Sequence, residues 1–176
     1  TLQDGQHLAF EPYSVTALVD ILRPRAAEGL YGRPDEDALE AIAERADGDA
    51  RNAIKCLEMV ARLFDEREDA DVDAALIDES MQRAKAYVRQ KASKRLRREE
   101  HIVYDVVRDL GSAQMGEIYS KYRARTTDAK TERSVRKWLR KMEDYNLVRS
   151  NGETSDRVYE AVEVPDELVG WLRQSA

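Results

Sequence analysis

The chain has 176 residues, of which 36 % are charged and 42 % are apolar. This length fits one ordinary domain or two small ones at ~100–200 residues each, and the apolar share is enough for a packed core. No run approaches the ~18 apolar residues of a membrane span and no signal peptide opens the sequence, so we expect a cytoplasmic protein. The single cysteine, Cys56, excludes an internal disulfide. With only His7 and His101 beside it, a zinc site is implausible and no metal site is expected.

The net charge of −6 is the sum of two unlike halves. Residues 1–80 hold 8 basic and 20 acidic side chains, a net charge of −12, whereas residues 81–176 hold 21 basic and 15 acidic ones, a net charge of +6. The second half therefore suits a polyanionic partner and the first does not. Arginine outnumbers lysine 21 to 8. An acidic, lysine-poor surface is typical of a halophilic protein, although a GC-rich genome would favour arginine as well.

Helical spacing of apolar residues predicts a small helical bundle in residues 1–80. The first helix begins near Val15, and Pro24 is expected to kink or restart it. Asp35 and Asp49 are expected to cap the second and third helices, and a fourth helix begins near Ala74. The expected apolar side of the third helix consists of Ile54, Leu57, Val60, Ala61 and Phe64.

A basic segment follows, and its helical signal continues through Lys85–Arg98. It holds seven basic residues and no acidic one. Two interpretations stay open: a solvated connecting helix, or a strut between domains that faces DNA phosphates. We therefore predict three parts, at residues 1–80, 81–98 and 99–176.

From Glu99 onward the pattern predicts three helices and then a β-hairpin. The first helix ends at Gly111, the second begins near Met115, and the third spans about Thr131–Tyr145. Two short strands then flank a turn at Asn151-Gly152, and a short final helix is expected from Asp166. Three helices followed by a hairpin is the order of a winged helix-turn-helix domain. The expected fold class is mostly α: a helical bundle followed by a winged helix.

The third of these helices has one apolar and one basic face when its residues are placed at ~100° intervals. Because the outward face of this helix enters the major groove in helix-turn-helix proteins, its cations are candidate DNA-binding residues. These candidates are Arg133, Arg136, Lys137, Arg140 and Lys141. The alternative is the ordinary charged face of an amphipathic helix, but such faces usually mix signs. Arg149 and Arg157 flank the hairpin turn, where they either reach a minor groove as a wing or are simply exposed strand arginines.

Three segments together resemble the archaeal family of replication initiators related to the origin recognition complex and the cell division control proteins. Phe10-Glu11-Pro12-Tyr13-Ser14 is similar to the F-x-P-Y motif that opens the lid of the family's AAA+ module. Gly48-Asp49-Ala50-Arg51-Asn52-Ala53-Ile54 is similar to its sensor-2 motif. Met115-Gly116-Glu117-Ile118-Tyr119-Ser120-Lys121-Tyr122 is similar to the G-E-[VI]-Y-x-x-Y helix of its winged helix domain. The resemblance covers about residues 8–165.

The resemblance implies a AAA+ lid followed by a winged helix that binds double-stranded origin DNA. It further implies an N-terminal AAA+ core, the replicative helicase and other initiator copies as partners. In the family, the arginine matching Arg51 reaches the phosphates of ATP or ADP, which are bound with Mg²⁺. A cation in the first turn of a helix is unfavourable for the helix dipole, so either a phosphate or a salt bridge to Asp47 or Asp49 would explain Arg51.

Two departures from the family pattern limit what this chain does alone. These 176 residues contain no Gly-x-x-x-x-Gly-Lys-[Ser/Thr] loop and no acidic strand motif for Mg²⁺, so we expect neither a cofactor nor ATP hydrolysis in this chain. The family's wing often contains Gly-Arg, whereas Arg157 follows Asp156 here. The chain begins with Thr1 rather than methionine, as a piece of a longer protein would.

Two other classes of function stay open. One is a stand-alone winged-helix transcription regulator whose acidic half is a dimerisation or effector domain. The other is a protein-interaction module, since some winged helices bind proteins. Salt-sensitive DNA binding is expected of the initiator and of the transcription regulator, but not of the protein-interaction module.

Overall fold

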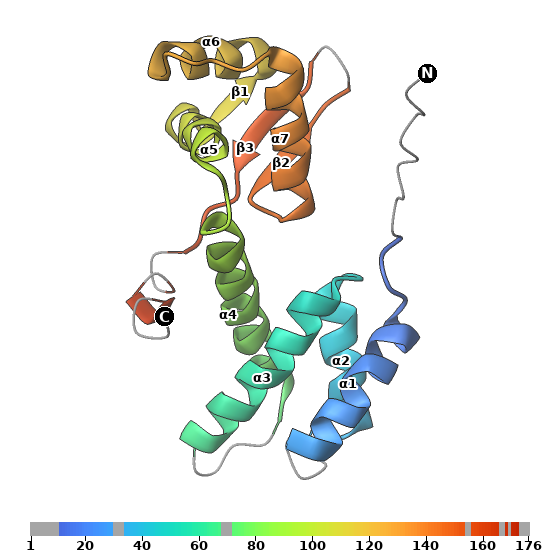
Figure 1. The fold of residues 1–176 in the computed structure, drawn as a ribbon. Coiled ribbons are helices and arrows are strands. Elements are labelled where there is room, and N and C mark those ends of the chain that lie inside the picture. The colour runs from blue at the N-terminus through green and yellow to red at the C-terminus, as the bar shows by residue number, and fades with distance from the viewer. Residues whose placement is uncertain are drawn as a thin grey trace. The chain divides into compact units, whose positions relative to one another are not determined.

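The computed structural model describes residues 11–29, 34–67, 72–153, 156–165, 168 and 170–172. The chain divides into two compact units, residues 1–88 and 89–176, and each unit is described by itself (Figure 1). The division of the chain into residues 1–80, 81–98 and 99–176 remains a prediction.

The first unit is helical. It contains α1 (Val15–Gly29), α2 (Glu36–Ala46), α3 (Ala50–Glu66) and the first part of α4 (Ala74–Ser93). Helices α1, α2 and α3 pack against one another. α4 is tied to α2 by the ion pair between Arg45 and Asp78, and to α3 by Cys56, whose Sγ lies 3.8 Å from the carbonyl oxygen of Ile77.

The predicted caps of α2 and α3 are confirmed. The Asp35 carboxylate accepts a hydrogen bond from the amide of Ala38 at 3.0 Å, and that of Asp49 accepts one from the amide of Arg51 at 2.8 Å. Such a side-chain oxygen satisfies a donor that the helix itself leaves unpaired. α2 ends at Asp47, which adopts the left-handed conformation with φ of 49°. The short polar turn between the two helices therefore follows from the sequence Asp47-Gly48-Asp49.

The structure refines two predictions for the first unit. α1 runs through Pro24 as a single helix, so of the two outcomes expected at this proline, a kink or a restart, the restart does not occur, and the Arg25 guanidinium donates to the carbonyl oxygen of Ile21 in the turn before the proline. The buried side of α3 is rotated from the expected one, because α3 contacts α1, α2 and α4 and these neighbours decide which side is covered. It consists of Asn52, Ala53, Cys56, Leu57, Met59, Val60 and Leu63, whereas Ile54, Ala61 and Phe64 are half-buried.

The basic segment is not one continuous helix. α4 ends at Ser93 and α5 begins at Arg98, so the predicted helical continuation through Arg98 is wrong. The chain turns between them because Ala92 and Leu96 are both buried in the core of the second unit. Residues four positions apart, such as Ala92 and Leu96, lie on the same side of a straight helix. The next apolar residues, Val103, Val106 and Val107, can be buried in the same core only if the chain changes direction and starts a new helix.

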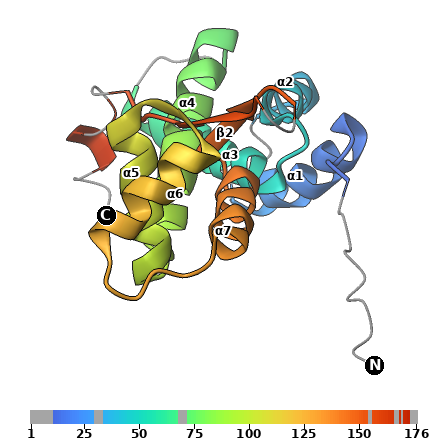
Figure 2. The ribbon, with the colours of Figure 1, turned by 90° about the horizontal axis from the view of Figure 1, so that it is seen from above.

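The second unit has the order of a winged helix domain. α5 (Arg98–Leu110) is followed by β1 (Ser112–Gln114), α6 (Met115–Arg125), α7 (Glu132–Asp144), β2 (Val148–Asn151) and β3 (Val158–Ala161). The antiparallel sheet has the order β1-β3-β2, with Ala113 opposite Tyr159 and Ser150 opposite Tyr159 on the other side. α5, α6 and α7 contact one another (Figure 2). The mostly helical fold class is confirmed.

One core holds this second unit together, with members from α5, α6, α7 and the sheet. Tyr122 of α6 is fully buried, its ring meets that of Trp138 edge-on at 6.0 Å, and its hydroxyl accepts a hydrogen bond from the Lys130 amide at 3.1 Å. That bond fixes the loop that leads into α7. Both tryptophans of the chain, Trp138 and Trp171, belong to this unit.

Some predictions fall outside the described residues. They are the start of the F-x-P-Y segment at Phe10 and most of the final helix expected from Asp166. Of that final segment, Leu168 and Leu172 are described and are buried.

Candidate nucleic-acid interface

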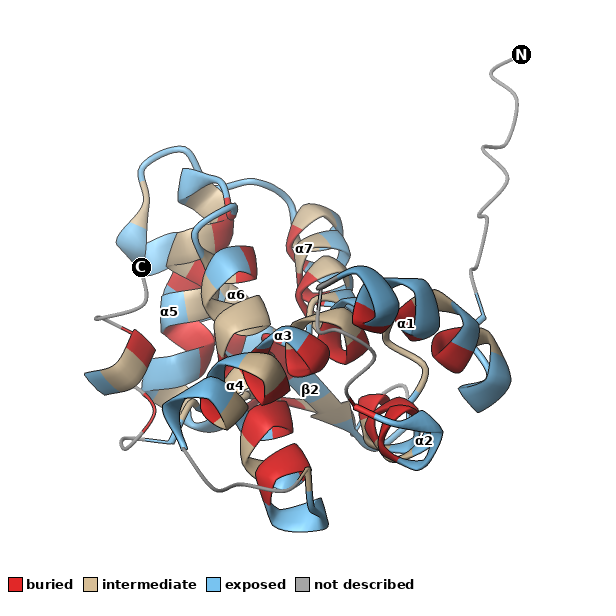
Figure 3. Ribbon diagram, turned by 90° about the horizontal axis from the view of Figure 1, so that it is seen from below, coloured by how far each residue is buried: buried red, intermediate tan, exposed pale blue. Residues whose placement is uncertain are grey.

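α7 separates apolar from basic side chains as the sequence predicts. The Thr131 hydroxyl caps the helix by accepting a hydrogen bond from the Ser134 amide at 3.3 Å. Val135, Leu139 and Met142 have no exposed surface, and they anchor the helix in the core. The helix therefore carries buried residues on one side and exposed ones on the other (Figure 3).

The outer side of α7 is a basic face, and four of the predicted cations lie on it. All four are exposed: Arg133, Arg136, Lys137 and Arg140. Each lies on a helix whose position is fixed by the core below, so the charges are held in a defined row. A row of fixed cations on one helix suits contact with the sugar-phosphate backbone and base edges of a duplex.

Lys141, the fifth predicted cation of α7, is turned toward α5. Its Nζ lies 2.8 Å from both carboxylate oxygens of Glu100, whose side chain is only 5 % exposed. Glu100 also accepts a hydrogen bond from the Arg97 amide at 2.9 Å, at the start of α5. This ion pair locks α7 to α5, so within the domain Lys141 already has an anionic partner.

Burial alone would raise the pKa of Glu100, but hydrogen bonds from Lys141 and from the Arg97 amide, together with the charges of both residues, hold that pKa below its ordinary value. The carboxylate therefore stabilises the folded unit fully above the unfolded-state pKa of about 4.3, and this contribution is lost as the pH falls through the lower folded-state pKa.

We expect Lys141→Met to lower the free energy of unfolding of the second unit by about 1–3 kcal/mol at neutral pH, because a buried carboxylate loses its charged partner. In the variant, burial dominates and raises the pKa of Glu100, so the deficit relative to wild type shrinks as the pH falls below about 5. Denaturant titrations followed by tryptophan fluorescence measure this, since both tryptophans lie in that unit. A deficit that stayed constant down to pH 3 would contradict the role of Glu100.

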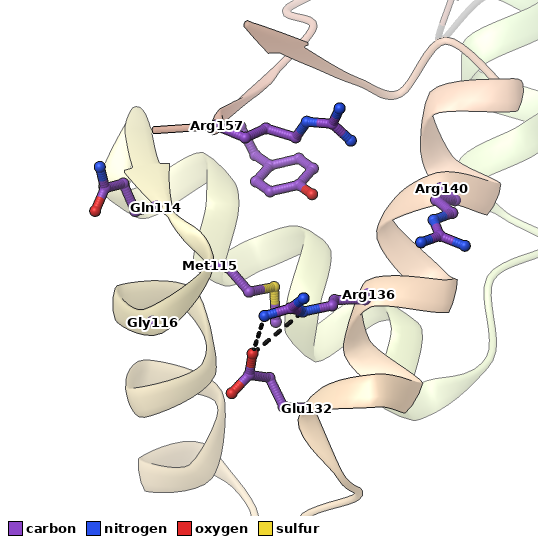
Figure 4. Close-up of a pocket in the computed structure, with 8 residues that line it drawn as sticks. Gln114, Met115, Gly116, Glu132, Arg136, Arg140 and Arg157 are labelled. Carbon is purple, nitrogen blue, oxygen red and sulfur yellow. Dashed lines mark hydrogen bonds and ion pairs between the residues drawn. The ribbon is translucent and has the colours of Figure 1, made fainter. Parts of the chain in front are cut away.

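Beside the basic face of α7 lies a cleft of about 360 Å³. We call it the arginine cleft, because three arginines line it, Arg136 and Arg140 from α7 and Arg157 from the residue before β3 (Figure 4). The other lining residues are Gln114, Met115, Gly116, Glu132 and Tyr159. Arg157 and α7 thus face one space although they are far apart in the sequence.

Two of the three arginines keep their positive charge uncompensated. Within the part of the chain that the structure describes, neither Arg140 nor Arg157 forms an ion pair, and the buried Nε of Arg157 has no hydrogen-bond partner. Arg136 differs, because its guanidinium is bound by Glu132 one turn earlier on α7, with Nε 3.1 Å from Oε1. The cleft therefore offers donors suited to an oxyanion such as a phosphate.

The two hairpin arginines behave differently from each other. Arg149 of β2 is paired across the sheet with Glu160 of β3, with its Nε 2.9 Å from the carboxylate, and the two residues are opposite each other in the register. Arg157 lines the arginine cleft instead. The hairpin thus supplies one cation to the cleft beside α7 and keeps the other in a surface ion pair.

The sequence interpretation missed two parts of this site. It did not place the first residues of α6 at the cleft, because their closeness to Arg157 depends on the pairing of β1 with β3. It also did not pair Glu132 with Arg136. The spacing of Glu132 and Arg136, four positions apart on a helix, was the available signal for their ion pair.

In the first unit, the two motif segments at Tyr13 and Gly48 lie in contact. The Tyr13 amide donates to the carbonyl oxygen of Gly48 at 3.1 Å, and Pro12 packs directly against Gly48. Arg51 is in the first turn of α3 as expected, with its side chain 54 % exposed, and its guanidinium pairs with Asp49 at 3.2 Å. The salt bridge considered for Arg51 is therefore present.

The remaining chemistry of the described residues is sparse. Burial raises the pKa of the Cys56 thiol to about 12, so this cysteine is a poor nucleophile. Within the described ranges, no three His, Cys, Asp or Glu side chains gather as a metal site requires. No helix that the structure describes is long and apolar enough to cross a membrane.

Comparison with known proteins gives a consistent set of similarities. The chain is 33 % identical over 167 residues to ORC1-type DNA replication protein 9 of Halobacterium salinarum, covering 92 % of this chain and 46 % of that protein. It is also 33 % identical over 136 residues to ORC1-type DNA replication protein 1 of the same organism, covering 77 % and 44 % respectively. The chain spans about half the length of the curated relatives it matches. No protein-family model matches it.

A solved structure has the same fold. The Aeropyrum pernix ORC1 protein, determined in complex with DNA, aligns with a TM-score of 0.61 at 22 % identity over 94 % of this chain and 48 % of that one. At this identity the likeness concerns the arrangement of helices and strands.

Proposed function

This chain is a homologue of the ORC1/Cdc6-type DNA replication initiators, covering roughly the C-terminal half of those relatives, and from that premise we propose that its second unit binds double-stranded origin DNA. The observation that carries the proposal is that the arginine cleft lies directly beside the basic face of α7. In a helix-turn-helix domain the third helix lies in the major groove, and here its exposed side is almost wholly basic.

The cations of the interface have two expected roles. With α7 in the major groove, its row of cations is close to base edges and to the backbone on either side. Arginine can donate to both acceptors of a guanine. Arg140 and Arg157, whose charges are uncompensated, converge from two elements on one cleft and suit a backbone phosphate. Lys141 and Arg149 are paired with Glu100 and Glu160, so we assign the main contacts to the other five predicted cations. The relative solved in complex with DNA supports this assignment of function.

We further propose that the first unit is the lid of a AAA+ initiator. Arg51 is exposed on the first turn of α3, and one of its partners is the half-buried carboxylate of Asp49, whose place on the guanidinium a nucleotide phosphate can take. Joined to a AAA+ core such as the resemblance implies, Arg51 would reach ATP or ADP bound there with Mg²⁺. As partners of such an initiator we propose the replicative helicase and further initiator copies, and the acidic first half suits a halophilic host.

The salt dependence of duplex binding tests the proposed DNA contact. We expect anisotropy of a labelled duplex to give an affinity that falls with a slope of about −3 to −5 in a plot of log K against log salt, because four to five cations each neutralise one phosphate. Binding that did not change with salt, or no binding at all, would favour a protein-interaction module.

A further inference from the structure

Glu132 stands out as an acid in a basic cleft. Among the described residues that line the arginine cleft, it is the only acidic one, and three arginines surround the same space. It also lies in the first turn of α7, the part of a recognition helix that approaches the bases and the backbone most closely. A carboxylate at this place repels DNA phosphates, so its presence in the cleft calls for a structural reason.

The carboxylate of Glu132 is bound to the cleft's own cation. Its Oε1 accepts from both Nε and the terminal nitrogen of Arg136, which is the geometry a phosphate oxygen would use (Figure 4). Oxygen acceptors of carboxylates and phosphates are interchangeable partners for a guanidinium. Glu132 therefore occupies, within the protein, the place of a DNA phosphate on Arg136.

The pair is able to open. The side chains of Glu132 and Arg136 are 42 % and 57 % exposed, and exposed ion pairs are weak because water and salt screen them. An incoming phosphate can take the guanidinium without disturbing the core, since neither side chain belongs to the buried side of α7.

We propose that Glu132 is an internal competitor that lowers the affinity of the domain for the DNA backbone by holding Arg136 until a phosphate displaces it. This inference rests on the proposed DNA binding of the second unit. Arg140 and Arg157 provide the first attraction for a phosphate, and Arg136 adds its contact only when Glu132 releases it. The device weakens binding to DNA of any sequence, which limits sequence-independent association with the backbone.

Glu132→Gln in the full 176-residue chain tests the competitor. Glutamine keeps the size of the side chain but removes the charge that binds Arg136. We expect affinity for two unrelated duplexes of equal length to rise by about three- to tenfold at low salt, with little change in the salt slope, because the same phosphate contact forms without first breaking the ion pair between Glu132 and Arg136.

A matched control comes from the ion pair between Asp109 and Arg125, which is exposed and does not line the cleft. Asp109→Asn also removes one acid and releases one arginine. We expect it to change affinity by less than about twofold, because its charge change lies away from the cleft and is screened. Tryptophan fluorescence melts of both variants check that the second unit stays folded.

A double-mutant cycle with Arg136→Ala separates competition from simple repulsion. In the Arg136→Ala background, the gain from Glu132→Gln should fall to the level of the control, because no guanidinium remains to be released. A full gain in that background would overturn the competitor role, as would unchanged or lower affinity of Glu132→Gln. A loss on one duplex alone would assign Glu132 to base contact instead. If wild type and every variant fail to bind DNA, the proposed function itself fails.

Discussion

Replacing Arg136 and Arg140 together by alanine is expected to weaken duplex binding by about 10- to 100-fold at low salt and to flatten the salt slope by about two. Both side chains are exposed on α7 and line the arginine cleft, and neither belongs to the core of the domain. The loss should therefore appear in DNA affinity with little change in thermal unfolding. Fluorescence anisotropy across about 50–200 mM salt measures both quantities.

The control for this variant removes the same charge from another surface. Arg108 of α5 and Arg125 of α6 are exposed arginines of the second unit that do not line the cleft. Arg108→Ala with Arg125→Ala should reduce affinity only through the change in net charge, by about a few-fold at low salt. Equal losses in the two double variants would mean that total charge, rather than the face of α7, decides binding.

The second large effect is expected at Gly48, where the two motif segments of the first unit meet only because glycine lacks a side chain. Its φ is +76°, and a Cβ at this position would lie 2.4 Å from Cβ of Pro12 and 3.2 Å from the carbonyl oxygen of Tyr13. Gly48→Ala should therefore lower the stability of the first unit by about 2–4 kcal/mol, of which the backbone conformation accounts for roughly 1–2.

Hydrogen exchange of the Tyr13 amide reports this change directly, because that amide is bonded to Gly48. We expect its protection to be lost in Gly48→Ala. Gly116→Ala is the matched substitution, since Gly116 lies within α6 with open space around its Cβ, and it should stabilise α6 by up to about 1 kcal/mol. If the Tyr13 amide stayed protected from hydrogen exchange in Gly48→Ala, the backbone around Pro12 and Gly48 would have to accommodate a Cβ at small cost.

The sequence predicts those parts of the structure that depend on near neighbours in the chain. The two faces of α7 follow from its 3.6-residue period, and the caps at Asp35 and Asp49 follow from local hydrogen bonding. Each of these signals lies within a few residues of the structure it specifies. The winged helix order was accessible for the same reason, although β1 was missed because it has three residues and pairs with a distant strand.

Other parts of the site depend on contacts that the chain makes across a long separation. Lys141 and Glu100 are 41 positions apart, so nothing in the local pattern distinguished Lys141 from its exposed neighbours. Arg157 was placed at a wing by its position beside a turn, yet its place at the cleft depends on how β3 pairs with β1. The helix predicted to continue up to Arg98 was wrong for a similar reason, because Leu96 is buried in the core of the second unit.

Site-directed photo-crosslinking tests most directly whether the basic face of α7 contacts DNA. The native thiol of Cys56 is fully buried with its pKa raised to about 12, so an introduced cysteine can be labelled selectively. A photoreactive group on Lys137→Cys should crosslink to a duplex, whereas the same group on Arg108→Cys should not, since Arg108 lies on α5 away from the cleft. Crosslinks at position 108 equal to or stronger than those at position 137 would contradict DNA binding through α7.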